Sequence, residues 1–284
     1  MSAARPPAGG TGRPGPVKKI TSFSNPLIKD IKALVGQRKH RQRTGRFVAE
    51  GLKLATDALA AGWTIDMLVL GPEALESDAA RETAARARAR GATILEVSTA
   101  VLAAVTRRDN PQMVVGVYEQ KFLAPEAIAK DPQGVWIALD HVRDPGNLGT
   151  ILRTADAVGA RGLLLIGETT DPFAVEAVRA TMGSIFHVPM TRMSREAFRA
   201  LAKKWPGTVV GTHLKGSTDY RTIPYARPTL LLMGNEQAGL PDEMAEACTH
   251  LARIPQVGQA DSLNLAVATA VMLYEIRRDD LSLT

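Results

Sequence analysis

Two uninterrupted apolar runs most constrain the fold of this chain, Leu163-Leu164-Leu165-Ile166 and Leu230-Leu231-Leu232-Met233. Neither run alternates between polar and apolar residues, so both faces of each predicted strand must be buried. This pattern is typical of a parallel β-sheet that helices cover on both sides. It predicts an α/β fold with a mostly parallel sheet for the second half of the chain.

Further strands and helices alternate around these two runs. We expect strands at 135–139, 163–166, 208–211, 229–233 and 250–254, and helices through Val158, from about Pro172, from about Ser194 and over 262–278. The polar, proline-bracketed stretch 120–132 precedes them and is typical of a linker. We therefore place the second domain at 133–284.

The first half predicts a smaller α/β unit over residues 20–119. A helix begins at Asn25-Pro26 and places its apolar residues on one face. Strands at 47–49, 65–70, 93–97 and 113–118 then alternate with helices near 52–61, 78–90 and 100–105. Residues 1–19 are rich in proline, glycine and alanine, and we expect a disordered basic tail there.

Charge is distributed unevenly along the chain. Residues 1–50 contain eleven lysines and arginines and two acidic residues, whereas the whole chain has a net charge of +6. A basic end on a nearly neutral body is expected of a protein that binds a polyanion. The tail alone could be a solvated charge run, but Arg38-Lys39-His40-Arg41-Gln42-Arg43 lies within sequence that reads as folded, and we expect a basic loop there.

Several classes of protein are disfavoured. The longest apolar run, 263–274, is too short to span a bilayer, and the first residues lack the apolar centre of a signal peptide. The single cysteine, Cys248, cannot form an internal disulfide, and no metal-ligand spacing surrounds it. We therefore expect a cytoplasmic protein without a metal or a membrane partner.

Three predicted strands are followed by polar, glycine-containing segments, where open parallel sheets bind ligands. The segments span 139–154, 230–241 and 253–264. Each has an ordinary structural explanation: Asn147 as a helix N-cap, Arg153 as a surface arginine, and Asp261 or Ser262 as the cap of the last helix. The two glycines around Glu236 would let the backbone approach a ligand closely.

Common nucleotide-binding and hydrolase motifs are missing. The sequence has no Gly-x-Gly-x-x-Gly after a strand, no Gly-x-x-x-x-Gly-Lys-Ser/Thr and no Gly-x-Ser-x-Gly. Dinucleotide binding, a P-loop NTPase and an α/β-hydrolase are therefore disfavoured.

In order, the three segments resemble the signature motifs of the SpoU/TrmH group of RNA 2′-O-methyltransferases in the SPOUT superfamily. The matching stretches are Asp-Pro-Gly-Asn-Leu-Gly-Thr-Ile-Leu-Arg-Thr-Ala (144–155), Met-Gly-Asn-Glu-Gln-Ala-Gly-Leu (233–240), Ile-Pro (254–255) and Ser-Leu-Asn (262–264). Thr181 and Gln256 depart from the residues common in the group, outside the proposed chemistry.

The first half is similar to the substrate-binding domain of rRNA-type members, which is related to kink-turn-binding ribosomal proteins. The similarity is carried by Ser-Asn-Pro-Leu-Ile-Lys (24–29), Gly-Arg-Phe-Val-Ala-Glu-Gly (45–51) and Asn-Pro-Gln (110–112). It implies an RNA-binding domain that resembles a ribosomal protein, in front of the catalytic one.

The resemblance implies a deep trefoil knot in the second domain, a homodimer, and S-adenosylmethionine as the methyl donor. It places the donor at Thr212, Gly234, Ile254 and Leu263, and the reacting ribose among Asn147, Arg153, Glu236, Ser262 and Asn264. A guanidinium stays protonated in proteins, so we expect Arg153 to bind phosphate rather than to act as a base.

We expect structured RNA as the substrate, 23S rRNA in preference to tRNA. The candidate RNA contacts are Arg38, Lys39, Arg41, Arg43 and Arg46. Two alternatives are a non-catalytic RNA-binding protein with this fold and a SPOUT enzyme that modifies a base. The intact set of site residues argues against the first, and the Asn-Leu-Gly-Thr-Ile-Leu-Arg segment argues against the second.

Overall fold

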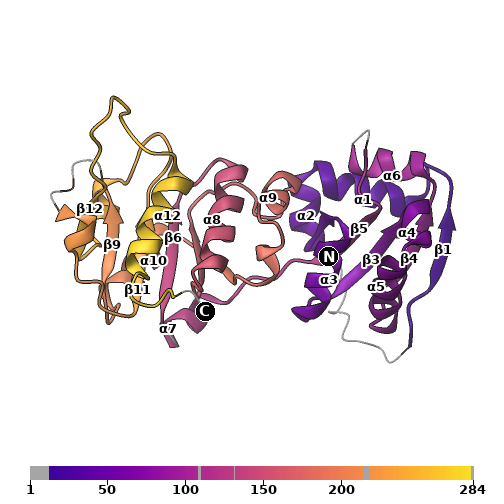
Figure 1. The fold of residues 1–284 in the computed structure, drawn as a ribbon, viewed down its shortest axis with the longest axis horizontal. Coiled ribbons are helices and arrows are strands. Elements are labelled where there is room, and N and C mark those ends of the chain that lie inside the picture. Colours follow the sequence, from indigo (N-terminus) through magenta and orange to yellow (C-terminus); the bar gives the residue numbers. More distant parts are fainter. Residues whose placement is uncertain (1–12, 108–109, 131, 214–215, 217, 283–284) are drawn as a thin grey trace, which may run out of the picture. The chain divides into compact units, whose positions relative to one another are not determined.

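The computed structural model divides the chain into two compact units. It describes residues 13–107, 110–130, 132–213, 216 and 218–282. One unit comprises Met1–Gln120 with Phe173–Val175, and the other comprises Lys121–Pro172 with Glu176–Thr284. Each unit is built on its own β-sheet (Figure 1).

The first unit contains a mixed five-stranded sheet in the order β1-β4-β3-β5-β2. Strands β1, β4 and β3 are parallel, while β5 runs antiparallel to β3 and β2. The strands are β1 (Val17–Ile20), β2 (Arg46–Glu50), β3 (Ile65–Leu70), β4 (Thr93–Val97) and β5 (Val114–Glu119).

Helices cover both faces of this sheet. Helices α1 (Pro26–Gly36) and α6 (Thr99–Thr106) bury their apolar residues against one face, where Ile28, Ile31 and Val105 are fully buried. Helices α3 (Leu52–Ala60) and α5 (Asp78–Ala89) contact strands of the sheet and each other, and α4 (Pro72–Glu76) contacts α5. The predicted α/β unit is therefore present.

Two predictions for the first unit are wrong. Val17–Lys19 belong to β1, which pairs with β4, although we expected a disordered tail up to residue 19; residues 1–12 lie outside the described part. The predicted basic loop is a helix, α2 (Arg38–Thr44), which ends at Gly45 in the left-handed conformation. Its residues contain no helix breaker, so local propensity favours a helix despite the charge.

The second unit contains a seven-stranded sheet in the order β10-β12-β9-β11-β6-β7-β8, and its strand pairs are parallel. This confirms the predicted parallel sheet. The strands are β6 (Val135–Asp140), β7 (Gly162–Ile166), β8 (Met190–Met193), β9 (Val209–Thr212), β10 (Thr218–Asp219), β11 (Thr229–Met233) and β12 (His250–Arg253).

The two apolar runs form β7 and β11, and their residues are buried on both faces. On one face Leu164 and Leu230 pack with residues of α7 (Pro125–Lys130), α10 (Arg195–Lys203) and α11 (Asp242–Ala245). On the other side α12 (Leu265–Ile276) contacts β11 and α8 (Pro145–Ala157). The remaining short elements are α9 (Val175–Ala180), η1 (Ser184–Phe186) and η2 (Tyr220–Thr222).

The expected linker 120–132 is not a free connection. It contains α7, which contacts β8, and Ile128 of this helix is fully buried in the core of the second unit. The proline bracket that suggested a linker instead marks the start of a short helix at Pro125.

Candidate active site

The three motif segments follow β6, β11 and β12, which lie close together in the second sheet, with β9 between β11 and β12. Strands β12, β9, β11 and β6 are adjacent and parallel, so their carboxyl ends meet at the same edge. A cavity of about 610 Å³ lies at this edge. Its walls come from Thr212, from the turn 233–242 and from residues between 252 and 268.

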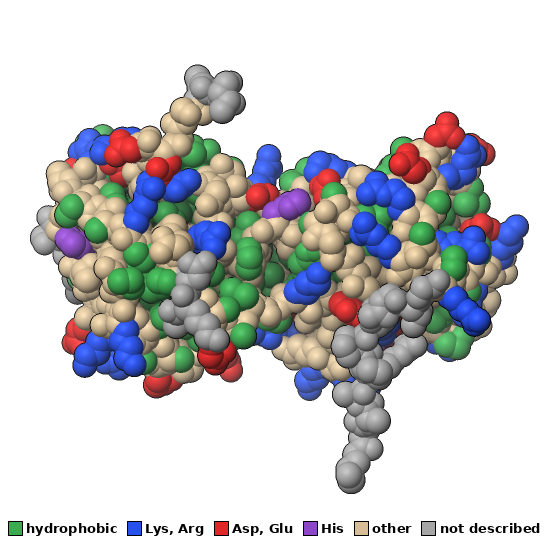
Figure 2. Space-filling view, turned by 90° about the horizontal axis from the view of Figure 1, so that it is seen from below, with side chains coloured by type: hydrophobic (Ala, Val, Ile, Leu, Met, Phe, Trp, Pro, Cys, Tyr) green, Lys and Arg blue, Asp and Glu red, His purple; other side chains and the backbone are tan. Residues whose placement is uncertain are grey.

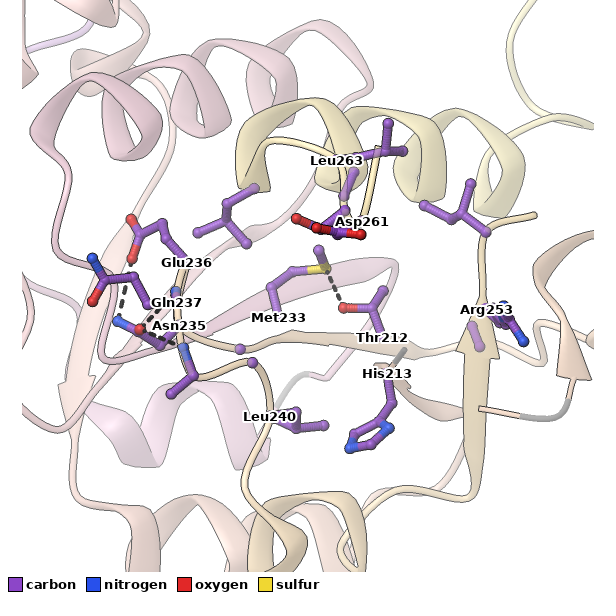
Figure 3. Close-up of a pocket in the computed structure, with 18 of the residues that line it drawn as sticks. Thr212, His213, Met233, Asn235, Glu236, Gln237, Leu240, Arg253, Asp261 and Leu263 are labelled. Carbon is purple, nitrogen blue, oxygen red and sulfur yellow. Dashed lines mark hydrogen bonds between the residues drawn. The ribbon is translucent and has the colours of Figure 1, made fainter. Parts of the chain in front are cut away.

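All four residues expected to hold the methyl donor line this cavity: Thr212, Gly234, Ile254 and Leu263. Figure 3 shows Thr212 and Met233 in the middle, with Glu236 and Gln237 at one end and Arg253 at the other. The Thr212 hydroxyl donates to the Met233 sulfur at 3.5 Å. Polar side chains such as Thr212 and Asp261 therefore lie beside the apolar Met233 in the middle of the cavity, and further polar side chains lie at its ends.

The glycines of the second motif shape the turn itself. A Cβ at Gly234 would overlap the backbone of Gly239, and Asn235 and Gly239 form an antiparallel bridge. Gly239 has a φ of +70°, which side chains rarely tolerate. We expected these glycines to make room for a ligand, but at Gly234 the close neighbour is the chain's own backbone.

Glu236 connects the second motif to the first. Its carboxylate accepts hydrogen bonds from the backbone N–H of Arg143 at 3.2 Å and of Asp144 at 3.1 Å. It also accepts from the Asn147 side-chain amide at 3.4 Å. Asn235 adds a second connection, since its amide donates to the His141 carbonyl at 2.8 Å.

Asn264 connects the third motif to the first. Its amide nitrogen donates to the Asn147 side-chain oxygen at 2.9 Å. Its own side-chain oxygen accepts from the backbone N–H of Ala266 and Val267 and so caps α12. Asn264, Asn147 and Glu236 therefore form one continuous hydrogen-bonded chain across three segments that are far apart in sequence.

Our expected helix caps are wrong. Asp144, rather than Asn147, caps α8, and Asn147 lies in the first helical turn. Asn264, rather than Asp261 or Ser262, caps α12. The Asn147 side chain is therefore not used as a helix cap. It donates to Glu236 and accepts from Asn264.

Ser262 and Arg153 occupy different surroundings. Ser262 is exposed and lines the cavity. Arg153 is exposed on α8, lines neither of the cavities described here and forms no ion pair with a described residue. Six residues along a helix turn it by about 240° from Asn147, which explains why the structure does not bring the two side chains together.

The candidate RNA-binding residues divide into two groups. Arg38, Lys39 and Arg43 are exposed on α2. Arg41 is buried and donates to the carbonyls of Leu34 and Val35 at the end of α1, so the structure contradicts its expected contact with RNA.

Arg46 has an internal role as well. Its guanidinium bridges Asp30 and Asp66 at 2.8 and 2.7 Å, so both terminal nitrogens that it could offer to a phosphate are already engaged. Burial alone would lower the pKa of Arg46, but these two carboxylates raise it above the ordinary value. On the face of the first unit seen in Figure 2, lysines and arginines are interspersed with acidic and apolar side chains.

A second cavity, of about 590 Å³, was not expected from the sequence. It shares the wall 235–239 and Pro241 with the first cavity and includes His141 and Arg195. Asp140 at its base is fully buried and accepts from two nitrogens of Arg195, at 3.0 and 2.8 Å. The hydrogen bond to Asp140 raises the pKa of Arg195. The only signal in the sequence was an Asp-His pair directly after a strand.

The described residues contain neither a membrane-spanning helix nor a metal-binding cluster. Within that part of the chain, no helix is both long and apolar enough to cross a bilayer. The same residues contain no group of three or more histidine, cysteine or acidic side chains suited to a metal ion.

A parallel sheet with a cavity at its carboxyl edge, walled by the second and third motif segments and joined to the first through Glu236, defines a SpoU-type methyltransferase domain. The chain belongs to the SpoU rRNA Methylase family, whose model matches residues 134–274. Residues 25–116 match the MRM3-like substrate binding domain. Both parts of the predicted resemblance are confirmed.

Similar proteins extend over nearly the whole chain. The 23S rRNA (guanosine(2553)-2′-O)-methyltransferase RlmP of Bacillus subtilis is 34% identical and covers 92% of this chain and 100% of its own. The AdoMet-bound rRNA methyltransferase structure from Sinorhizobium meliloti is 55% identical, with a TM-score of 0.86 over 94% of this chain and 99% of that one.

A third relative has also been solved with the methyl donor. The SpoU methyltransferase AviRb from Streptomyces viridochromogenes, in complex with AdoMet, is 32% identical with a TM-score of 0.78. The match covers 90% of this chain and 99% of that structure. The two-part architecture is therefore shared along the full length of these proteins.

Proposed function

We propose that this chain transfers a methyl group from S-adenosylmethionine to a ribose 2′-hydroxyl of ribosomal RNA. One observation carries the proposal: all four expected donor-binding residues line one cavity at the motif edge, in a chain 55% identical to an AdoMet-bound rRNA methyltransferase. The hydrogen-bonded chain Asn264–Asn147–Glu236 adjoins that cavity, because Glu236 is part of its wall.

The cavity suits the methyl donor in size and lining. Its volume of about 610 Å³ lies within the range of about 300–1,000 Å³ typical of small-molecule sites. Leu263, Ile254 and the Gly234 backbone would hold the donor, which supplies a sulfonium-activated methyl group. The polar end at Glu236 would face the RNA.

The side chains at this end would orient the ribose. Asn147 is fixed from both sides, by Glu236 and by Asn264, so its amide has one orientation when RNA arrives. Such preorganisation lowers the barrier by positioning the nucleophile rather than by covalent chemistry. Ser262 lines the same cavity, and we assign it to the ribose site as well.

Arg153 has a separate role in this proposal. Its exposed guanidinium would bind an RNA phosphate, for which its planar set of donors is suited. On the first unit Arg38, Lys39 and Arg43 would contact the RNA backbone, whereas Arg41 and Arg46 would hold the domain together.

Ribosomal RNA is favoured over transfer RNA. The relatives aligned along more than nine-tenths of this chain include enzymes named for positions 2553 and 2479 of 23S rRNA. The relatives named for tRNA or rRNA in Bacillus subtilis and Staphylococcus saprophyticus cover about half of it. One relative aligned along 92% of this chain is itself named as an uncharacterized tRNA/rRNA methyltransferase, so the two enzymes named for 23S rRNA carry the preference, and the first unit would select the ribosomal substrate.

We further propose a homodimer through α12, a trefoil knot in the second unit and a cytoplasmic location. Val267 and Tyr274 are half exposed and lie seven residues apart, with Val271 between them, so they form one apolar stripe on α12. Replacing Val267 and Tyr274 by glutamate would yield monomers in sedimentation velocity. A double variant that still sediments as a dimer would exclude this face.

Two measurements test the function. Calorimetry with S-adenosylmethionine should show binding to the folded chain, and no heat would end the proposal. Mapping of 2′-O-methyl groups in 23S rRNA from a strain lacking the gene should reveal one missing methylation. Restoration by the wild-type gene and not by Asn147→Ala would assign the reaction to this site.

A further inference from the structure

The second cavity contains a histidine held in an unusual backbone conformation. His141 has a φ of +54°, a region that residues other than glycine rarely adopt. Its backbone N–H donates to the Ile166 carbonyl, and its carbonyl accepts from Asn235. Residues kept in such conformations are held by their surroundings and cluster at functional sites.

The imidazole ring is fixed as firmly as the backbone. Gly167 lies directly beneath it, since any Cβ at that position would overlap the ring. The ring Nδ1 lies 2.8 Å from the fully buried Asp140 carboxylate. An ionised carboxylate only accepts, so Nδ1 carries the proton and, in the neutral ring, Nε2 is left as a hydrogen-bond acceptor.

The charges around this cavity do not suit a phosphate. All three guanidinium nitrogens of Arg195 are engaged, two by Asp140 and one by Glu243 at 3.2 Å. Asp140, Asp144 and Glu236 line the cavity against Arg143 and Arg195, so acidic groups outnumber basic ones. The lining presents acceptors to a neutral ligand that donates hydrogen bonds.

The cavity also lies beside the proposed ribose site. Glu236 lines both cavities and accepts from Asn147. In a nucleotide the glycosidic bond leaves the carbon next to the one that bears the 2′-hydroxyl. A base attached to a ribose at Asn147 is therefore within reach of the second cavity, whose wall includes Glu236. Splayed-out RNA bases are commonly read on their edges by side chains and stacked on histidine or arginine.

Resting on the function proposed above, we infer that this second cavity holds the base of the methylated nucleotide and that His141 reads its edge. The fixed Nε2 accepts a hydrogen bond from a ring N–H or exocyclic amine of that base. The volume of the cavity, about 590 Å³, admits a nucleobase. His141 is then a specificity-determining residue, and Asp140 with Arg195 positions it.

The test compares base discrimination in two His→Asn variants. Transcripts spanning the mapped 23S rRNA position are made in four versions that differ only in the base at that position. Asparagine tolerates a positive φ, so His141→Asn keeps the backbone while it alters the acceptor. His187→Asn, at an exposed histidine of the same unit, is the matched control.

Wild type and His187→Asn should methylate one transcript at least tenfold faster than the other three, in single-turnover reactions. His141→Asn should reduce that preference to about threefold or less, mainly by slowing the preferred transcript about tenfold, as expected for one hydrogen bond. Its affinity for S-adenosylmethionine should equal that of wild type.

Three results would overturn the inference: equal rates of wild type on all four transcripts, unchanged discrimination in His141→Asn, or equal slowing of all four. If His141→Asn unfolds at a lower temperature than wild type, His141→Gly is tested in its place, because glycine tolerates the positive φ at this position. The same loss of base discrimination is expected. The proposed function fails separately, if 23S rRNA from the deletion strain lacks no 2′-O-methyl group, and this outcome keeps the two failures apart.

Discussion

Replacement of Asn264 separates two roles that one side chain performs. Its oxygen caps α12 by accepting from Ala266 and Val267, and its nitrogen donates to Asn147. Asn264→Ala removes both interactions. Asn264→Asp keeps an acceptor for the cap and improves its charge at the helix N-terminus, but it removes the donor that faces Asn147.

The two variants should therefore differ in stability and resemble each other in activity. Loss of the cap costs about 1 kcal/mol, and loss of an exposed side-chain hydrogen bond costs about 0.5 kcal/mol more. Asn264→Ala should lower the free energy of unfolding by about 1.5 kcal/mol, whereas Asn264→Asp should stay within about 0.5 kcal/mol of the parent.

Activity depends on the orientation of the Asn147 amide. In Asn264→Asp two acceptor oxygens would face each other, so the amide turns over and presents its oxygen to Glu236. Misorientation of the Asn147 amide in the transition state should lower kcat by about tenfold, which corresponds to about 1.4 kcal/mol in the barrier. Asn264→Ala should lose activity to a similar extent.

The assays are urea unfolding followed by tryptophan fluorescence and single-turnover methylation of 23S rRNA from the deletion strain. Binding of S-adenosylmethionine by calorimetry serves as the control for an intact cavity. An Asn264→Asp enzyme with kcat within twofold of the parent would refute the hydrogen-bonded chain as a determinant of catalysis. An alanine variant as stable as the parent would refute the capping role.

Three further predictions concern other parts of the molecule. Arg41→Ala should lower the free energy of unfolding by about 2 kcal/mol, because it leaves buried carbonyls at the end of α1 unsatisfied. Joint replacement of Arg38, Lys39 and Arg43 should instead weaken RNA binding and flatten its salt dependence. Equal losses of stability in both variants would contradict the assignment of Arg41 to the fold and of the other three residues to RNA. Arg153→Lys should lose most methylation despite its retained charge, because the planar donor geometry is lost; wild-type turnover would exclude a positioning role. Burial raises the pKa of the Cys248 thiol to about 12. Iodoacetamide at pH 8 should therefore label the folded chain at least tenfold more slowly than the chain unfolded in guanidinium. Equal labelling rates would mean that the thiol is accessible.

Five of the seven strands in the second sheet were predictable because local composition defines them, whereas β8 and β10 were not predicted. Runs such as Leu230–Met233 have one stable environment, the interior of a covered parallel sheet, and β11 has the predicted bounds 229–233. The motif segments followed from the same reasoning, since their positions after strands place them at one edge.

Side-chain partners were less predictable, because they depend on tertiary contacts. Arg41 lies in a run of basic residues that suggests RNA, yet the end of α1 offers it unpaired carbonyls. Asp261, Ser262 and Asn264 near the start of α12 could each serve as its cap. Asn264 is the cap in the structure, and it also donates a hydrogen bond to Asn147. The positive φ of His141 has no sequence signal comparable to a glycine.

The contacts of Glu236 limit what its substitution can reveal about catalysis. The carboxylate accepts from two backbone N–H groups and from the Asn147 amide, so every partner at this point is a donor. Glutamine offers one acceptor oxygen and a donor amide, and that amide would face one of the same N–H groups. Glu236→Gln must therefore disturb the contacts of the Oε2 position with the Arg143 N–H and the Asn235 amide, even where an oxygen at the Oε1 position still accepts from Asn147. A loss of activity in that variant alone does not identify Glu236 as a base; only a change in the pH–rate profile, with Asn147 still correctly oriented, would do so.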